Sequence, residues 1–156
     1  MKKSILLFAA LLITMTVAAQ RTSKTAFNTC DVIIVGTPYQ SDQNYPKKME
    51  EAMIKGGFKV DDKKDSLFIT SKPLKVLGGW QIMSLQAQTD DIIIRSQFKY
   101  DKAYYKSLRH PGTDFTYTQY QGVSRDTHKK VNTICFNKME KMAKIIGVPG
   151  RKAYSY

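Results

Sequence analysis

The segment from Trp80 to Tyr100 constrains the fold more than any other part of the chain. Apolar and polar residues alternate along it in two successive runs, which is the pattern of strands that bury one face. Thr89, Asp90 and Asp91 lie between the runs, where such residues favour a turn. The segment therefore predicts an antiparallel hairpin, which we expect in the middle of a sheet. The alternating positions are Met83, Leu85, Ala87, Ile92, Ile94, Ser96, Phe98 and Tyr100.

Two other segments have the spacing of amphipathic helices, with apolar residues every three to four positions. The first runs from Pro46 to Lys55 and is followed by two glycines, which favour a helix end. The second runs from His128 to about Ile146 and is followed by Gly147. We expect these two helices to cover the sheet.

Short runs of apolar and β-branched residues predict the remaining strands. One spans 31–35, and another spans 66–70 and continues past Pro73, which suits a sheet edge. Residues 61–65 are charged and predict a turn between them. We therefore predict an α+β fold, with an antiparallel sheet in β-α-β-β-β-α order and two helices packed on one face.

The first 19 residues have the pattern of a cleavable signal peptide. Lys2 and Lys3 precede an apolar run that ends at Val17, and small residues follow at Ala18 and Ala19. The run is shorter than the roughly 20 residues that span a bilayer. No cysteine follows directly, which argues against a lipid anchor. We predict a periplasmic or secreted protein that is cut after Ala19.

The rest of the chain has the size of one ordinary domain. We divide it into a flexible arm at 20–30, a single domain at 31–150 and a loose tail at 151–156. The whole chain has a formal charge of +12, to which the signal peptide contributes only two lysines. A basic protein favours anionic partners.

Cys30 and Cys135 are the two cysteines of the chain, and in an oxidising compartment such a pair usually forms a disulfide. We predict this bridge, which would stabilise the fold by about 4 to 5 kcal/mol because it closes a long loop. The alternatives are two buried free thiols or a reactive Cys30, although no CxxC pair or adjacent histidine accompanies Cys30.

Residues 101–126 follow neither periodicity and are rich in tyrosine and basic residues. Long irregular segments in small domains are often functional. Aromatic faces beside lysine or arginine can stack on sugars or bases and neutralise negative charge. The alternative is that these tyrosines cover the sheet. The candidate ligand-binding residues are Tyr104, Tyr105, Arg109, His110, Tyr117 and Tyr120.

Residues with catalytic or metal-binding chemistry are few. His110 has Arg109 and Asp114 nearby, but no partner at a fixed spacing, and His128 lies at a helix start. The paired aspartates lie in predicted turns and lack the spacing of a calcium loop. We therefore predict no catalytic residue, metal or cofactor. Trp80, which follows two glycines, is interpreted as a core anchor.

The order of elements resembles the helix-grip or TATA-binding-protein-like class of small secreted Bacteroides-type domains. It is loosely similar to the domains of the outer-membrane assembly lipoprotein C. The segments that carry the likeness lie between Asp31 and Gly147: PKKMEEAMIKGGFKV, SLFIT, the hairpin that starts at Trp80, and KMAKIIG. The resemblance implies a non-catalytic envelope protein. The chain lacks the lipidated cysteine of the lipoprotein.

Three functions are compatible with these features. The first is a secreted, non-enzymatic domain that acts through protein contacts or binds an anionic envelope component such as lipopolysaccharide or glycan. The second is a small secreted hydrolase that uses the loop around His110. The third is an extracellular nucleic-acid binder, whose affinity would fall steeply with salt.

Overall fold

The computed structural model describes residues 26, 29–36, 45–65, 67–88, 90–108, 115–126, 130–147 and 152–155, without the side chains of 62–65. The predicted signal peptide and most of the predicted arm lie outside these residues. None of the described helices has the length and hydropathy needed to cross a bilayer.

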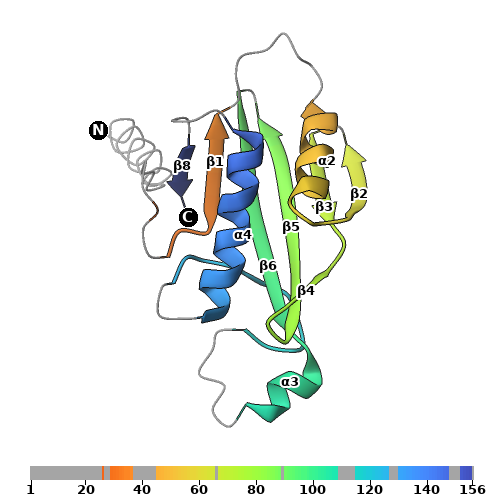
Figure 1. The fold of residues 1–156 in the computed structure, drawn as a ribbon, viewed down its shortest axis with the longest axis vertical. Helices are drawn as coiled ribbons and strands as arrows, with labels where there is room; N and C mark the ends of the chain where they lie inside the picture. Colours follow the sequence, from red (N-terminus) through yellow and green to blue (C-terminus); the bar gives the residue numbers. More distant parts are fainter. Residues whose placement is uncertain are drawn as a thin grey trace, which may run out of the picture.

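The described residues form one antiparallel sheet, in which the predicted hairpin is central (Figure 1). The strand order is β2-β3-β5-β6-β1-β8, with β4 paired to β5 and β7 paired to β6. The predicted hairpin is confirmed as β5 and β6, which pair from Gly79 and Tyr100 to Gln88 and Asp91. The strands are β1 (Val32–Gly36), β2 (Val60–Asp65), β3 (Phe68–Ser71), β4 (Leu74–Val76), β5 (Gly79–Gln88), β6 (Asp91–Tyr100), β7 (Gln121–Gly122) and β8 (Lys152–Ser155).

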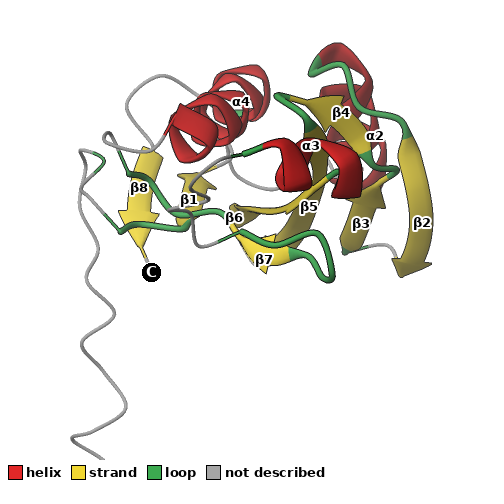
Figure 2. Cartoon of the chain, turned by 90° about the horizontal axis from the view of Figure 1, so that it is seen from below, coloured by secondary structure: helices red, strands yellow, loops and turns green. Residues whose placement is uncertain are grey.

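The two long helices, α2 (Tyr45–Lys55) and α4 (Lys130–Ile146), lie on the same face of the sheet (Figure 2). The described part of the chain has one more helix, the short α3 (Lys102–Ser107), at the end of the hairpin. The α+β class and the antiparallel sheet are therefore confirmed. The observed order contains more strands than the predicted β-α-β-β-β-α order.

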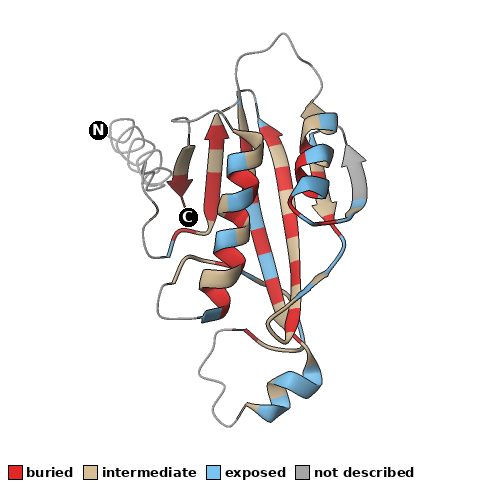
Figure 3. Cartoon of the chain, in the orientation of Figure 1, coloured by how far each residue is buried: buried red, intermediate tan, exposed pale blue. Residues whose placement is uncertain are grey.

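The core lies between the sheet and the two long helices. Burial alternates along β5 and β6, as the sequence pattern predicts (Figure 3). Leu85 pairs with Ile94, and Ile94 pairs with Ile33, so that three fully buried side chains form one row across the sheet. Met139 and Met142 of α4 belong to the same core cluster.

Two predictions at the sheet edges are wrong. Residues 61–65, predicted as a charged turn, belong to β2, which pairs with β3 at one edge. An edge strand has one solvated side, so it accepts charged residues that a central strand would exclude.

The tail at 151–156, predicted to be loose, contains β8, which pairs with β1 at the other edge. Tyr154 is 3% exposed, its ring stacks on Phe136 at a centroid distance of 6.3 Å, and its hydroxyl donates to Glu140 Oε1 at 2.7 Å. Burial and the neighbouring Glu140 carboxylate raise the pKa of the Tyr154 phenol well above its usual value. The strand is thus held by its pairing with β1 and by the contacts of Tyr154 with α4, which no local pattern in the tail reveals.

The predicted disulfide is not formed in the structure, where Cys30 and Cys135 are both buried and neither is joined to another cysteine. The prediction came from the oxidising compartment, which carries no information on distance. A bridge also requires Cα atoms within about 7 Å and facing Cβ vectors. The alternative of two buried thiols is what the structure has. Burial raises the pKa of the Cys135 thiol to about 12.

We expect neither thiol to react in the native protein. The thiolate is the reactive form, and burial shields both thiols from reagent and raises the pKa of the Cys135 thiol. A colorimetric thiol titration at mildly alkaline pH should detect no thiol in the folded protein and both in concentrated guanidinium chloride. Detection of none in the denatured, unreduced protein would contradict the free thiols and indicate a bridge.

Candidate functional site

The face of the sheet opposite α2 and α4 has no described helix on it. Its side chains occupy the positions of β5 and β6 that alternate with the core, and they are half-buried or exposed. Residues of β3 and β4 extend the same face through the strand pairing. We call this surface the open face. It consists of Phe68, Thr70, Lys75, Trp80, Ile82, Ser84, Gln86, Ile93, Arg95, Gln97 and Lys99.

Aromatic and basic side chains alternate in a line across one end of the open face. Lys75 pairs with Trp80 across β4 and β5, and Trp80 pairs with Lys99 across β5 and β6. The Lys75 ammonium lies 5.4 Å from the centroid of the Trp80 ring. The Lys99 ammonium lies 4.6 Å from the centroid of the Tyr120 ring. We call Lys75, Trp80, Lys99 and Tyr120 the Trp80 row.

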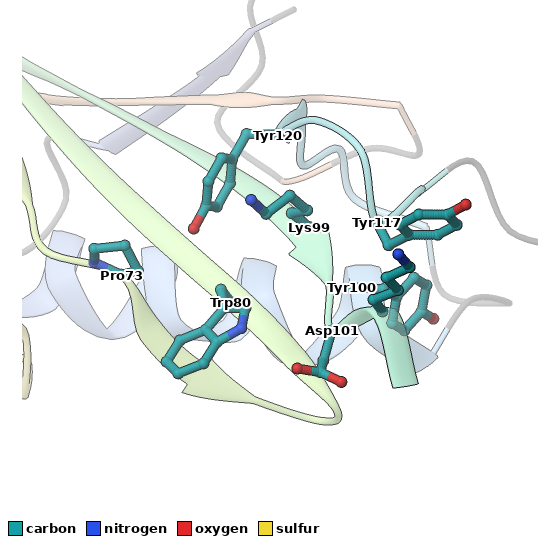
Figure 4. A pocket seen from close by; sticks show the side chains of 8 residues that line it. Pro73, Trp80, Lys99, Tyr100, Asp101, Tyr117 and Tyr120 are labelled. Carbon is teal, nitrogen blue, oxygen red and sulfur yellow. The ribbon is translucent and has the colours of Figure 1, made fainter. Parts of the chain in front are cut away.

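A cavity of about 440 Å³ lies at the Trp80 row and opens to solvent (Figure 4). Figure 4 shows Lys99 beside the Tyr120 ring, with Trp80 coming from β5 and Pro73 from the connection between β3 and β4. The hairpin strands supply Trp80 and Lys99, and the irregular segment after α3 supplies Tyr117 and Tyr120. The residues lining the cavity are Pro73, Trp80, Lys99, Tyr100, Asp101, Lys102, Tyr117 and Tyr120.

The charge of this cavity is positive. Among the described residues, no acidic side chain forms an ion pair with Lys75, Lys99 or Lys102. The Asp101 carboxylate also lines the cavity, but it caps α3 and accepts from the backbone N–H of Ala103 at 2.9 Å and of Tyr104 at 3.2 Å. Burial raises the pKa of the Tyr120 phenol, which therefore stays neutral. The two lysines of the lining outnumber its one carboxylate, so an anion entering the cavity would meet a net positive charge.

A scan against protein-family models, a search of curated proteins and a search of solved structures each found no match for this chain. In the part of the chain that the structure describes, no three His, Cys, Asp or Glu side chains gather in a way that could hold a metal ion.

The predicted ligand-binding tyrosines divide into two groups. Tyr117 and Tyr120 line the cavity, as binding would require. Tyr104 stacks on Tyr100 at a centroid distance of 5.8 Å, and Tyr105 contacts the rings of Tyr100 and Tyr117 at 5.9 and 5.1 Å. These contacts fasten α3 to the end of the hairpin. Tyr104 and Tyr105 do not line the cavity.

Two of the predicted residues, Arg109 and His110, lie outside the described residues, as do Asp114 and His128. The hydrolase hypothesis that depends on the His110 loop therefore stays a prediction.

The interpretation of Trp80 as a core anchor is wrong. Trp80 is half-buried on the open face, whereas its chain neighbours Gly79 and Gln81 are buried. The alternation that identified the hairpin contains the signal that was missed, because Trp80 has the parity of Ser84 and Gln86 and not that of Met83 and Leu85. The same rule places Lys99 and Arg95 on the open face. Lys75 could not be found this way, because a proline interrupts the pattern before β4.

Proposed function

We propose that this protein is an exported, non-enzymatic binding domain that holds an anionic polymer of the cell envelope on its open face. The observation that carries the proposal is the Trp80 row, in which Lys75, Trp80 and Lys99 lie on adjacent strands and the Tyr120 ring lies beside Lys99. A chain of ring-shaped, negatively charged units would place its rings on Trp80 and Tyr120 and its charges near Lys75 and Lys99.

The composition of the cavity supports binding in preference to catalysis. A hydrolytic site needs a nucleophile and a base within hydrogen-bond reach, and an oriented acid. Of the eight described residues that line the cavity, only Asp101 has a carboxylate, and this carboxylate caps α3. The remaining polar groups are lysine ammonium and tyrosine hydroxyl groups, which suit recognition of anions and hydroxyl groups.

Export and the fold class belong to the same proposal. The signal-peptide pattern supports a periplasmic or secreted location, where envelope glycans and lipopolysaccharide are the abundant anionic polymers. The helix-grip class is supported by the placement of α2 and α4 on one face of an antiparallel sheet, which leaves the other face available to a ligand.

Fluorescence titration tests the proposal directly, because Trp80 is the sole tryptophan of the sequence. The purified protein is titrated with lipopolysaccharide, polygalacturonate, neutral dextran and single-stranded oligothymidylate. We expect the two anionic envelope-type polymers to shift the Trp80 emission to shorter wavelength, because they exclude water from the ring. Dextran should cause no shift.

The salt dependence and the order of affinities decide the outcome. Binding of the anionic glycan should weaken with added salt but persist at near-physiological ionic strength, because the ring contacts are not screened. The proposal fails if no anionic polymer changes the emission, or if dextran binds as well as polygalacturonate. Tighter binding of oligothymidylate than of either glycan would instead favour the nucleic-acid alternative.

A further inference from the structure

A second hollow, of about 220 Å³, lies on the open face farther along the same strands. It is more enclosed than the cavity at the Trp80 row. The Ser84 and Arg95 pair lines it, four residues along β5 and β6 from the Trp80 and Lys99 pair. At about 3.3 Å per residue, the two hollows are about 13 Å apart along the strands.

The lining of the second hollow combines apolar and polar groups on different elements. Phe68 and Ile82 provide apolar surface, and Thr70, Ser84 and Gln97 provide hydroxyl and amide groups. Their strand positions place all five on the open face. An apolar surface ringed by hydrogen-bonding groups is the lining expected of a site that orients a small polar ring.

Two charged groups, Asp31 and Arg95, line the same hollow without forming an ion pair. Within the described part of the chain, the Arg95 guanidinium forms no ion pair, and its distance to Asp31 exceeds that of a salt bridge. The Asp31 Oδ1 atom is buried and has no hydrogen-bond partner among the described residues. Burial raises the pKa of the Asp31 carboxyl, while the positive charge of Arg95 acts in the opposite direction. The exposed Arg95 guanidinium is therefore available to a ligand, whereas the Asp31 Oδ1 atom is closed off from solvent.

We propose that the second hollow is a subsite for one carboxylated sugar unit of the polymer that binds the Trp80 row. The planar guanidinium of Arg95 matches a carboxylate in a bidentate geometry. Phe68 and Ile82 would contact the ring, and the Ser84 and Gln97 side chains would hydrogen-bond with its hydroxyl groups. The volume equals that of about seven water molecules at roughly 30 Å³ each, which suits a single ring.

This subsite rests on the proposed function and makes it more specific. A ligand that fills both hollows spans about 13 Å, so it has to be an oligomer and not a single sugar. The preferred polymer carries carboxylates, as in polysaccharides of uronic acids, in place of sulfates or phosphates alone. Linking two modest subsites on one chain raises the affinity by making the second contact intramolecular.

The experiment compares polygalacturonate with its methyl ester and with dextran sulfate, using the native protein and the variants Arg95→Gln and Arg95→Lys. Native protein should bind polygalacturonate at least about tenfold more tightly than the methyl ester. Arg95→Gln should weaken polygalacturonate binding by about tenfold and dextran sulfate binding by less than about threefold. Arg95→Lys keeps the positive charge but loses the planar guanidinium. Its affinity for polygalacturonate should therefore lie between those of the native protein and Arg95→Gln.

Lys141→Gln is the matched control, because it removes one positive charge from the exposed side of α4, away from the open face. This variant should change the affinity for polygalacturonate and the affinity for dextran sulfate by no more than about twofold each. Arg95 is exposed, so each variant should keep the thermal unfolding midpoint of the native protein.

The possible results separate the two proposals. If native protein binds neither polygalacturonate nor dextran sulfate, the proposed function fails together with the subsite. If it binds both, and Arg95→Gln weakens the two equally or not at all, only the carboxylate subsite is refuted. The carboxylate subsite is supported if Arg95→Gln weakens binding of polygalacturonate more than binding of dextran sulfate, while Lys141→Gln binds both as the native protein does.

Discussion

A chain that ends before β8, after residue 151, should lose about 4 to 6 kcal/mol of its free energy of unfolding. Burial of an aromatic side chain such as Tyr154 is worth about 2 kcal/mol, and each hydrogen bond of the ladder and the Tyr154 hydroxyl contributes roughly 1 kcal/mol. Single domains have total stabilities of about 5 to 15 kcal/mol. The truncated chain should therefore be close to unfolding at room temperature, which urea unfolding followed by circular dichroism would measure.

Tyr154→Phe is the matched control for this truncation. It keeps the ring on Phe136 and the pairing of β8 with β1, and it removes only the hydroxyl that donates to Glu140. Its free energy of unfolding should fall by about 1 kcal/mol. If the free energies of unfolding of the truncated chain and the full chain differ by less than about 0.5 kcal/mol, β8 adds nothing to stability. The prediction of a loose tail would then be correct.

The central part of the fold could be predicted from the sequence because its pattern is local. Alternation from Trp80 to Tyr100 identified both strands of the hairpin and its core-facing side, and the spacing from Pro46 to Lys55 identified α2. Each of these elements buries its own apolar face, so the signal lies within the segment itself.

The edges of the sheet could not be predicted, because what holds them lies elsewhere in the chain. The four residues of β8 are too few to show a period, and Tyr154 is buried by Phe136 and Glu140 of α4. In β2, the charged residues that suggested a turn are tolerated because one side of an edge strand is solvated. Tertiary contacts decide whether such segments form strands.

The candidate site was half predicted for a related reason. Composition drew attention to the tyrosines of the irregular segment, and two of them, Tyr117 and Tyr120, line the cavity. Composition could not separate them from Tyr104 and Tyr105, which pack against Tyr100. The partners that make the cavity basic come from strands, and strand pairing brings Lys75 and Lys99 to either side of Trp80.

Trp80→Ala should weaken binding of polygalacturonate by about 30-fold, the largest loss we expect from one side chain on the open face. Tryptophan at the centre of a binding surface commonly contributes about 2 kcal/mol, and every 1.4 kcal/mol is a factor of ten in affinity. Because the substitution removes the intrinsic probe, isothermal titration calorimetry is used for all variants. Trp80→Phe keeps an aromatic face and should lose less than about fivefold.

Two controls separate loss of the ring from loss of the fold. Tyr45→Ala removes a half-buried ring from α2, on the helix-covered side, and should leave the affinity within about twofold of the native value. Trp80 is half-buried, so its removal should lower the free energy of unfolding by no more than about 1 kcal/mol. Equal affinity in native protein and Trp80→Ala would show that Trp80 does not contact the ligand. The open face would then bind through charge alone, and the Lys75→Gln and Lys99→Gln variants would account for the whole salt dependence.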